Sequence, residues 1–325
     1  MSAAVAAASP LAGLGRRLVS QEAVLLVALV LLFLVVGGIN PRFVAERNLQ
    51  TIFLGNAYVA VAAIGMSMVI ISGNIDVSVG SLIGVLAVLS GSIAVAGWPI
   101  WLSWLVPVLA GMVATGIMGF LVAYLGIPSI VVTLGFLSIL KGGLIMATGG
   151  AWISNLPPGY ALAQMEPLGV PMPIWFMVVL TCGAAFWMRY SGLGRSIYAV
   201  GGNAEAARLA GISRPKVVLQ VFLLHGAFAG IASVLFATQL SVIQSTVPPN
   251  LELTIITASV VGGVSILGGI GSVVGSTLAA ILLAAIGSSL IFLSVSPYWI
   301  RAVQGVLILA TVLADLWRRR RQGAR

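Results

Sequence analysis

Charged side chains are scarce in this chain. Only 7% of its 325 residues are Asp, Glu, Lys or Arg, and 60% are apolar, whereas a typical soluble domain has about 25% charged residues. A water-soluble globule needs charge to cover its surface. The composition therefore excludes a soluble enzyme, a soluble nucleic-acid-binding protein and a disordered scaffold, and it indicates a polytopic membrane protein.

The residues of most catalytic and metal sites are also nearly absent. His225 is the single histidine and Cys182 the single cysteine, too few for a Ser-His-Asp triad, a multi-histidine zinc site or a disulfide framework. Neither lysine, Lys141 or Lys216, follows a glycine-rich phosphate loop. We therefore expect no catalytic residue, no metal site and no bound cofactor. His225 is expected to be a helix-packing or pore-facing polar residue.

Long apolar runs are what the sequence has in abundance. The run Ala23–Val36 is continuous, unlike the alternating strands of a membrane β-barrel, and about 20 apolar residues are enough for a helix to cross a bilayer. The fold class is therefore predicted as an all-α polytopic membrane protein with about ten transmembrane helices and discontinuous segments near 73–80 and 252–271. For 252–268, a spanning and a re-entrant course both remain open. The expected spans are 21–38, 51–72, 77–97, 101–125, 128–148, 171–189, 217–240, 252–268, 272–294 and 297–315.

The basic residues predict the orientation. Twelve of the 16 fall in three places: Arg16 and Arg17, the segment 189–216, and the tail after residue 317. With ten spans all three places lie on one side of the membrane, which the positive-inside rule identifies as cytoplasmic. Both termini are then cytoplasmic, and the opposite loop 149–170 carries no Lys or Arg. The net charge of +9 is thus explained by topology and contact with anionic lipid, not by nucleic acid.

A polar stretch interrupts two apolar runs around Asp76. Asn74, Asp76 and Ser78 stand there close together, and an ionisable group at mid-bilayer costs about 2.5–3.5 kcal/mol on insertion scales, so it needs a partner or a role. One interpretation is a capped break between two helices. The other is a discontinuous helix lining a solute path, and the two are compatible.

A second such segment begins at Glu252. Thr257 and Ser259 follow it, and then the glycine-rich stretch 262–271. Glu252 can be a favourable charge at a helix N-terminus, and the small and polar residues suit close helix packing. Two glycine-rich breaks, one in each half of the chain, are typical of transporters built from repeats, although no sequence repeat is evident.

The loop 190–216 contains a predicted short helix. Asn203 is a good N-cap, 204–210 are mostly strong helix formers, and Gly211 is a good C-terminal stop. This composition favours a helix that docks on another protein, and the alternative is a linker helix lying on the membrane. The candidate docking residues are Asn203, Glu205, Ala206, Arg208, Leu209 and Gly211.

Three stretches, in this order, resemble the permease subunits of ribose-type ABC sugar importers, within the branched-chain amino acid and monosaccharide permease family. They are 74–84, 194–211 and 252–271, which resemble the family patterns G-x-I-D-[LV]-S-V-G, G-G-N-x-x-A-A-R-x-x-G-I and E-L-x-x-I-x-x-x-V-x-G-G-x-S-x-x-G-G-x-G, and the similarity covers about residues 23–316. Departures such as Asn74 and Val264 look closer to the rhamnose and autoinducer-2 branch.

The resemblance implies a permease that imports a monosaccharide or sugar-like solute by alternating access. It implies three protein partners: a cytoplasmic ABC ATPase that uses the ATP, a periplasmic or extracellular solute-binding protein, and a second permease subunit, identical or paralogous. The location would be the bacterial inner membrane, and the domains a cytoplasmic segment 1–20, a permease domain 21–316 and a basic tail 317–325.

The expected translocation path comprises Asn74, Asp76, Ser78, Glu252, Thr257 and Ser259. Two alternatives stay open. One is a branched-chain amino-acid ABC permease. The other is an ion-coupled secondary transporter, for which Asp76 and Glu252 are the available carboxylates.

Overall fold

The chain folds into a helical bundle. A computed structural model describes residues 21–323, with side chains described to Trp317. The predicted segment 1–20 and residues 324–325 of the basic tail lie outside the described residues, and only the backbone of 318–323 is described. Within that range the elements are helical apart from one isolated antiparallel bridge between Ile153 and Ile243. In chain order they are α2 (Gln21–Ile39), η1 (Pro41–Val44), α3 (Glu46–Ile71), α4 (Val79–Val95), α5 (Ile100–Tyr124), α6 (Ser129–Thr148), η2 (Leu162–Gln164), η3 (Pro167–Gly169), α7 (Met172–Tyr190), α8 (Gly192–Gly202), α9 (Ala204–Leu209), α10 (Arg214–Ala237), α11 (Leu251–Val261), α12 (Val273–Phe292) and α13 (Trp299–Gly323).

The expected all-α membrane class is confirmed. Among residues 21–323, 8 helices are long and apolar enough to cross a bilayer. The other two predicted spans correspond to short apolar helices, α4 with 17 residues and α11 with 11. At 1.5 Å per residue α11 is roughly 16 Å long, about half of a 30 Å hydrocarbon core. The predicted segment 252–268 is therefore a half-length helix followed by a glycine-rich loop.

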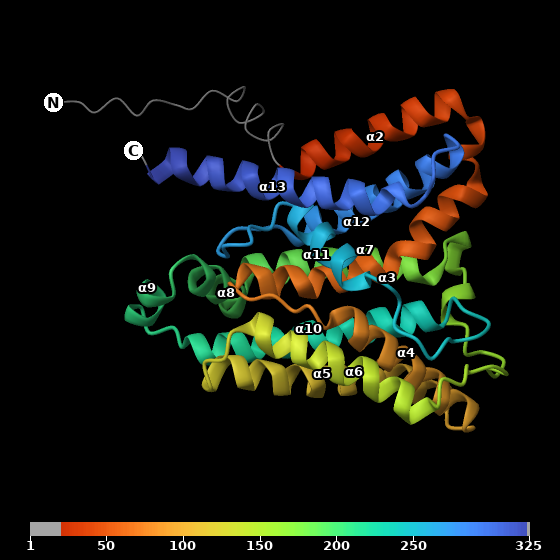
Figure 1. Cartoon of the computed structure of the whole chain (residues 1–325), viewed down its shortest axis with the longest axis horizontal. Coiled ribbons are helices and arrows are strands. Elements are labelled where there is room, and N and C mark those ends of the chain that lie inside the picture. Colours follow the sequence, from red (N-terminus) through yellow and green to blue (C-terminus); the bar gives the residue numbers. More distant parts are fainter. Residues whose placement is uncertain (1–20, 324–325) are drawn as a thin grey trace.

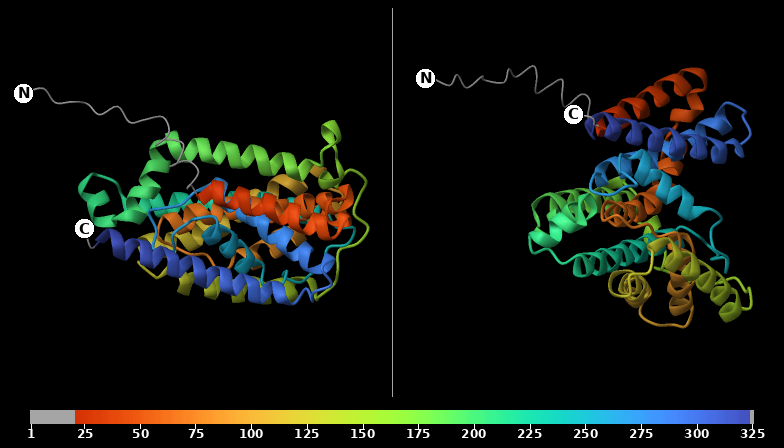
Figure 2. Two further views of the ribbon diagram at one scale, coloured as in Figure 1. Left: turned by 90° about the horizontal axis from the view of Figure 1, so that it is seen from above. Right: turned by 60° about the vertical axis from the view of Figure 1, so that its left-hand side comes forward.

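The helices stack in layers from one edge of the bundle to the other (Figure 1). Helices α2 and α13 form one edge and α5 and α6 the other, and the views in Figure 2 agree. Helices α3 and α10 lie at the centre, and almost every residue of α3 from Ala57 to Ile71 is buried. The edge helices expose apolar side chains, as expected for surfaces that meet lipid.

The two short helices follow inverted courses (Figure 1). Helices α8 and α9, the start of α2 and the end of α13 lie at one end of the bundle, which we call the α9 end. Helix α3 runs toward the α9 end, 72–78 turns back, and α4 begins midway and runs to the far end. Helix α10 runs to the far end, 238–250 turns back, and α11 begins midway and runs to the α9 end. The two halves thus have opposite directions, although no sequence repeat marks them.

Helices α3 and α11 end in the same way, at a glycine with positive φ. Gly73 has φ +82° and Gly263 has φ +96°. The amides of Gly73 and the next residue donate to the carbonyls of Ile70 and Val69 at 2.9 and 3.1 Å. Gly263 and its successor make the equivalent bonds at 2.9 and 3.1 Å. This is the Schellman arrangement, which satisfies terminal carbonyls and sharply redirects the chain.

A glycine face on α4 accommodates the extended segment 243–250. A Cβ at Gly80 would lie 2.8 Å from the Glu252 amide nitrogen, and one at Gly84 would lie 3.2 Å from Val247 Cα. Glycine permits these close backbone approaches. The segment therefore runs along α4 and places the first turn of α11 against the first turn of α4.

Helix α8 was not expected, because the sequence predicted one short helix in the loop 190–216. Its glycines lower its helix propensity, but tertiary contacts compensate. The Ser191 hydroxyl caps the helix by accepting from the Gly194 amide at 2.8 Å, and Ile197 and Val200 are buried. Burial of this amphipathic face stabilises α8 in spite of the low propensity.

Candidate functional site

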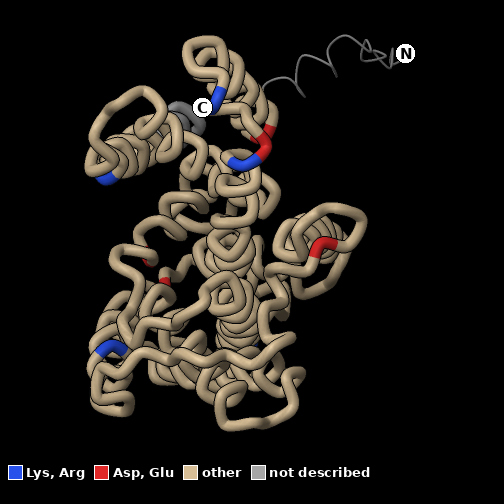
Figure 3. Tube along the Cα trace, turned by 90° about the vertical axis from the view of Figure 1, so that its right-hand side faces the viewer, with Lys and Arg blue, Asp and Glu red and all other residues tan. Residues whose placement is uncertain are grey.

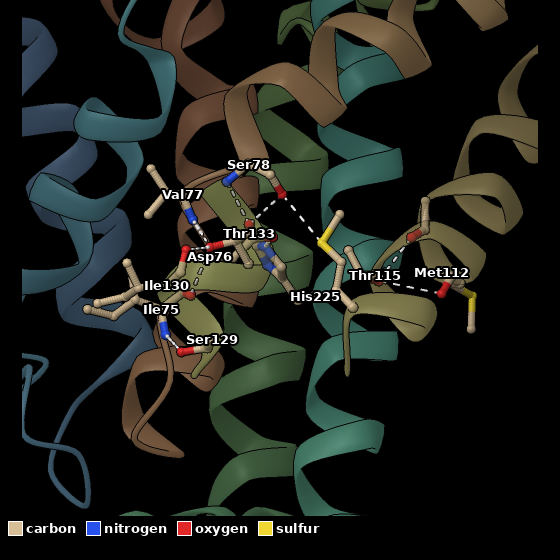
Figure 4. Close-up of polar contacts among 12 residues, drawn as sticks. Ile75, Asp76, Val77, Ser78, Met112, Thr115, Ser129, Ile130, Thr133 and His225 are labelled. Carbon is tan, nitrogen blue, oxygen red and sulfur yellow. Dashed lines mark hydrogen bonds and ion pairs between the residues drawn. The ribbon is translucent and has the colours of Figure 1, made fainter. Parts of the chain in front are cut away.

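Asp76 lies in the break between α3 and α4 and is completely buried. One carboxylate oxygen, Oδ1, accepts hydrogen bonds from the Ser78 amide at 2.7 Å and the Ser78 hydroxyl at 2.6 Å. The other oxygen, Oδ2, lies 3.1 Å from Nε2 of His225 on α10 (Figure 4). Asp76 thus shapes the turn before α4, whose N-cap residue is Ser78 and has no side-chain cap, and its second oxygen links the break to α10.

Two hydroxyls from α6 hold the backbone of the same break. Ser129 Oγ accepts from the Ile75 amide at 3.1 Å, and Thr133 Oγ1 accepts from the Val77 amide at 3.1 Å. Figure 4 shows both side chains reaching the extended segment. Irregular backbone at membrane depth is tolerated only where its polar groups find partners. Helix α6 supplies those partners.

The buried His225 ring fits against a glycine of α3. A Cβ at Gly65 would lie 2.9 Å from His225 Nδ1, so the ring occupies the space that a larger residue would fill. Within the described residues Nδ1 has no hydrogen-bond partner. Sequence reasoning placed His225 inside the membrane but missed its pairing with Asp76. A signal existed, because an intramembrane carboxylate requires a partner and His225 is the one histidine of the chain.

The structure brings Glu252 close to the first break. Its backbone packs on Gly80, only a few residues after Asp76 and Ser78, and it stands in the first turn of α11, as expected. Asn74 is also buried and donates to the Ser72 hydroxyl at 3.1 Å. The four predicted polar residues nearest the two helix starts thus gather in one region.

The remaining two predicted residues lie further along α11. Thr257 is buried and donates to the Leu253 carbonyl of its own helix. Ser259 is buried in a hydroxyl cluster, 3.4 Å from Ser67 Oγ on α3, and Ser67 donates to Ser276 Oγ on α12 at 2.6 Å. This cluster joins three helices, and sequence reasoning did not identify its members from α3 and α12.

Three segments meet through glycines at the α9 end. Gly201 of α8 packs on the last turn of α3, where an added Cβ would overlap the Ile71 carbonyl oxygen and lie 2.8 Å from the Gly269 amide nitrogen. Gly269 donates to the Ile71 carbonyl at 2.8 Å. A Cβ at Gly268 would lie 3.1 Å from Gly73 Cα. We call Gly73, Gly201, Gly268 and Gly269 the glycine junction, which links α8 to both breaks.

Helix α9 has the caps that the sequence predicted. The Asn203 side chain accepts from the amides of Glu205 and the next residue at 3.1 and 2.9 Å, and Gly211 has φ +82°. Arg208 pairs with Glu205 at 2.6 Å on the surface, and this hydrogen bonding lowers the pKa of Glu205. Leu209 is 76% exposed. The helix therefore presents an apolar and charged surface at the end of the bundle.

Comparison with known proteins agrees with this architecture. The chain is 36% identical, over 91% of its length and 86% of the relative, to a Salmonella typhi protein named autoinducer 2 import system permease protein LsrC. The protein of the same name from Escherichia coli (strain K12 / DH10B) is 33% identical over 91% of the chain and 87% of the relative. No solved structure matches. Residues 48–312 match the family described as branched-chain amino acid transport system / permease component, and the chain therefore belongs to this family.

Proposed function

We propose that this chain is the membrane-spanning permease subunit of an ATP-driven importer, carrying a sugar-like solute such as autoinducer 2. The observation that carries the proposal is the 36% identity, over 91% of the chain, to a relative named as an autoinducer 2 import permease. The chain is a transport subunit and not an enzyme. ATP is hydrolysed by a separate ATPase, and this chain binds no cofactor.

The proposed orientation places the α9 end in the cytoplasm of a bacterial cell, as part of the inner membrane. Both ends of the described chain lie at the α9 end (Figure 1), where most basic residues fall in the sequence. Some Lys and Arg are also visible from the far end (Figure 3), but the loop 149–170 carries none, and Glu166 is its only charged residue. The ATPase then docks on α9, and a solute-binding protein delivers solute at the far end.

Coupling in this proposal passes through the glycine junction. Helix α9 follows α8 after Asn203, and Gly201 of α8 packs on the Ile71 carbonyl and the Gly269 amide. A displacement of α9 by the ATPase therefore reaches the ends of α3 and α11 together. The ATPase binds the inward-open and the outward-open arrangement of the helices with different affinities, and this difference drives alternating access. A second permease subunit completes the assembly. No part of this proposed function involves nucleic acid.

The proposed path still comprises the two breaks. Asp76 and Ser78 hold the first break in shape, and Glu252 stands where the two short helices meet. Thr257 and Ser259 are enclosed here between helices, so they line the path only in a state where α11 has moved away from α3. Asn74 shares the first break.

The test is reconstitution of the chain in proteoliposomes with an ABC ATPase and a solute-binding protein of an autoinducer 2 import system. We expect uptake of autoinducer 2 that requires ATP and survives an ionophore. Uptake without ATP that an ionophore abolishes would identify an ion-coupled secondary transporter. Uptake of L-leucine and not of autoinducer 2 would favour the second candidate, a branched-chain amino-acid permease, which the family description supports.

A further inference from the structure

A polar cavity opens in the far half of the bundle, away from the Asp76 break. It lies between α3, α11, α12 and α13 and has a volume of about 330 Å³, at the lower end of the range for small-molecule sites. We call it the polar cavity because six of its 14 lining residues are polar, and the other eight are apolar or glycine. The polar side chains are Asn48, Thr51, Asn56, Thr254, Ser288 and Gln304.

The cavity extends into the apolar span of α3. Asn48, Thr51 and Asn56 stand at positions i, i+3 and i+8 of the helix, so they lie on one face of α3. Asn56 stands 5 residues after the start of the predicted span at residue 51, which corresponds to roughly 7 Å of helix. Lipid-facing positions inside a span are normally apolar, so this polar face indicates a surface that does not meet lipid.

Two amides of the cavity lining retain hydrogen-bonding capacity. Asn56 Nδ2 donates to the Ile52 carbonyl at 3.1 Å, and Gln304 Nε2 donates to Thr254 Oγ1 at 3.4 Å. No hydrogen bond to Asn56 Oδ1 or Gln304 Oε1 is formed by the described part of the chain. These oxygens can accept hydrogen bonds from solute hydroxyls, and the hydroxyl of Thr51 offers a further acceptor.

The lining contains no Asp, Glu, Lys, Arg or His. An amino acid is a zwitterion and would leave both of its charges without partners here, at a large desolvation cost. A neutral solute rich in hydroxyl groups has only hydrogen bonds to satisfy, and amides and hydroxyls satisfy them. We propose that this polar cavity binds the transported solute on its way inward and selects an uncharged, polyhydroxylated molecule. The proposal rests on the proposed import function.

Cysteine accessibility tests this assignment without relying on transport alone. The native cysteine is first removed by Cys182→Ser. Asn56→Cys and Gln304→Cys are then made separately in this background. The control is Ser138→Cys, which stands mid-helix on the exposed face of α6. A membrane-impermeant, charged methanethiosulfonate is applied from the far end to the assembled complex in proteoliposomes.

We expect both cavity cysteines to react at least tenfold faster than the control. Saturating autoinducer 2 is expected to slow both reactions at least threefold, and L-leucine is expected to leave them unchanged. Asn56→Leu removes one hydrogen bond to the solute, and we expect a 2- to 10-fold rise in the half-saturating concentration for uptake.

Import by the Cys182→Ser complex is measured in parallel, which separates the two possible failures. If import occurs but the cavity cysteines react as slowly as the control, or gain no protection from autoinducer 2, the cavity assignment is wrong and the import function stands. Protection by L-leucine, or a disulfide between Gln304→Cys residues of two subunits, also overturns it. If the complex imports no sugar-like solute, the proposed function fails and the assignment with it.

Discussion

Gly201→Ala tests the glycine junction directly. An added Cβ would overlap the Ile71 carbonyl oxygen and lie 2.8 Å from the Gly269 amide nitrogen, and overpacking of this kind costs about 1–3 kcal/mol. Gly202→Ala is the matched control, because its Cβ would lie 3.9 Å from the nearest atom, Gly269 Cα. Both changes gain up to about 1 kcal/mol of helix propensity. The difference between them therefore isolates the packing cost.

A packing cost of about 1–3 kcal/mol lowers the equilibrium constant for the contact between α8 and α3 by roughly 5- to 150-fold. The readouts are the melting temperature of the purified complex and the ATP hydrolysed per solute imported. Gly201→Ala is expected to lower the melting temperature and raise the ATP cost, whereas Gly202→Ala should match the wild type. If the two variants behave alike, the junction does not couple α9 to the breaks.

Four further predictions address the breaks and the docking helix. Asp76→Ala leaves the buried His225 without its partner and should destabilise the protein by about 3–5 kcal/mol in thermal unfolding. The double variant with His225→Ala should cost less than the sum of the two single changes. Simple additivity would contradict an interaction between the two residues. Thr133→Val removes the acceptor for the partly buried Val77 amide and should cost about 1 kcal/mol in the same assay. Ser138→Ala on the exposed face of α6 should cost almost nothing, and equal effects would contradict the role of α6. Arg208→Ala should raise the ATP hydrolysed per solute imported. It should not change the melting temperature, because an exposed ion pair adds little stability. An unchanged ratio of ATP to solute would argue against docking of the ATPase through α9. Because Arg208 lowers the pKa of its glutamate partner, that pair is intact at neutral pH and is lost only as pH falls through the depressed pKa, so wild-type coupling should not change between pH 6 and 8.

Local patterns were enough to predict much of the architecture. Apolar runs predicted the long helices, Asn203 and Gly211 predicted the limits of α9, and the polar residues around Asp76 predicted the first break. Each of these features depends on neighbours within a few residues. Their physical causes, helix capping and the burial of apolar surface, are visible in sequence.

The features that the sequence did not predict depend on distant contacts. His225 pairs with a carboxylate 149 positions away, and the hydroxyls of α6 reach the break across more than 50 positions. Helix α8 is stabilised by burial against its propensity. The polar cavity requires four helices to be placed side by side. Local patterns do not encode such pairings, because many arrangements satisfy the same local preferences. The pair of Asp76 and His225 is the exception, because a buried carboxylate requires a partner and the chain has one histidine.

The break around Asp76 also has a consequence for how the protein is made. Its amides are satisfied by Ser129 and Thr133, 54 and 56 residues later in the chain, and its carboxylate by His225, 149 residues later. At 5–20 residues per second a ribosome needs roughly 7–30 s to synthesise the last of these intervals. The first break therefore leaves the ribosome long before its partners exist. Until then, water or the insertion machinery has to supply its hydrogen-bond partners, so the break reaches its final structure only after α10 has been synthesised.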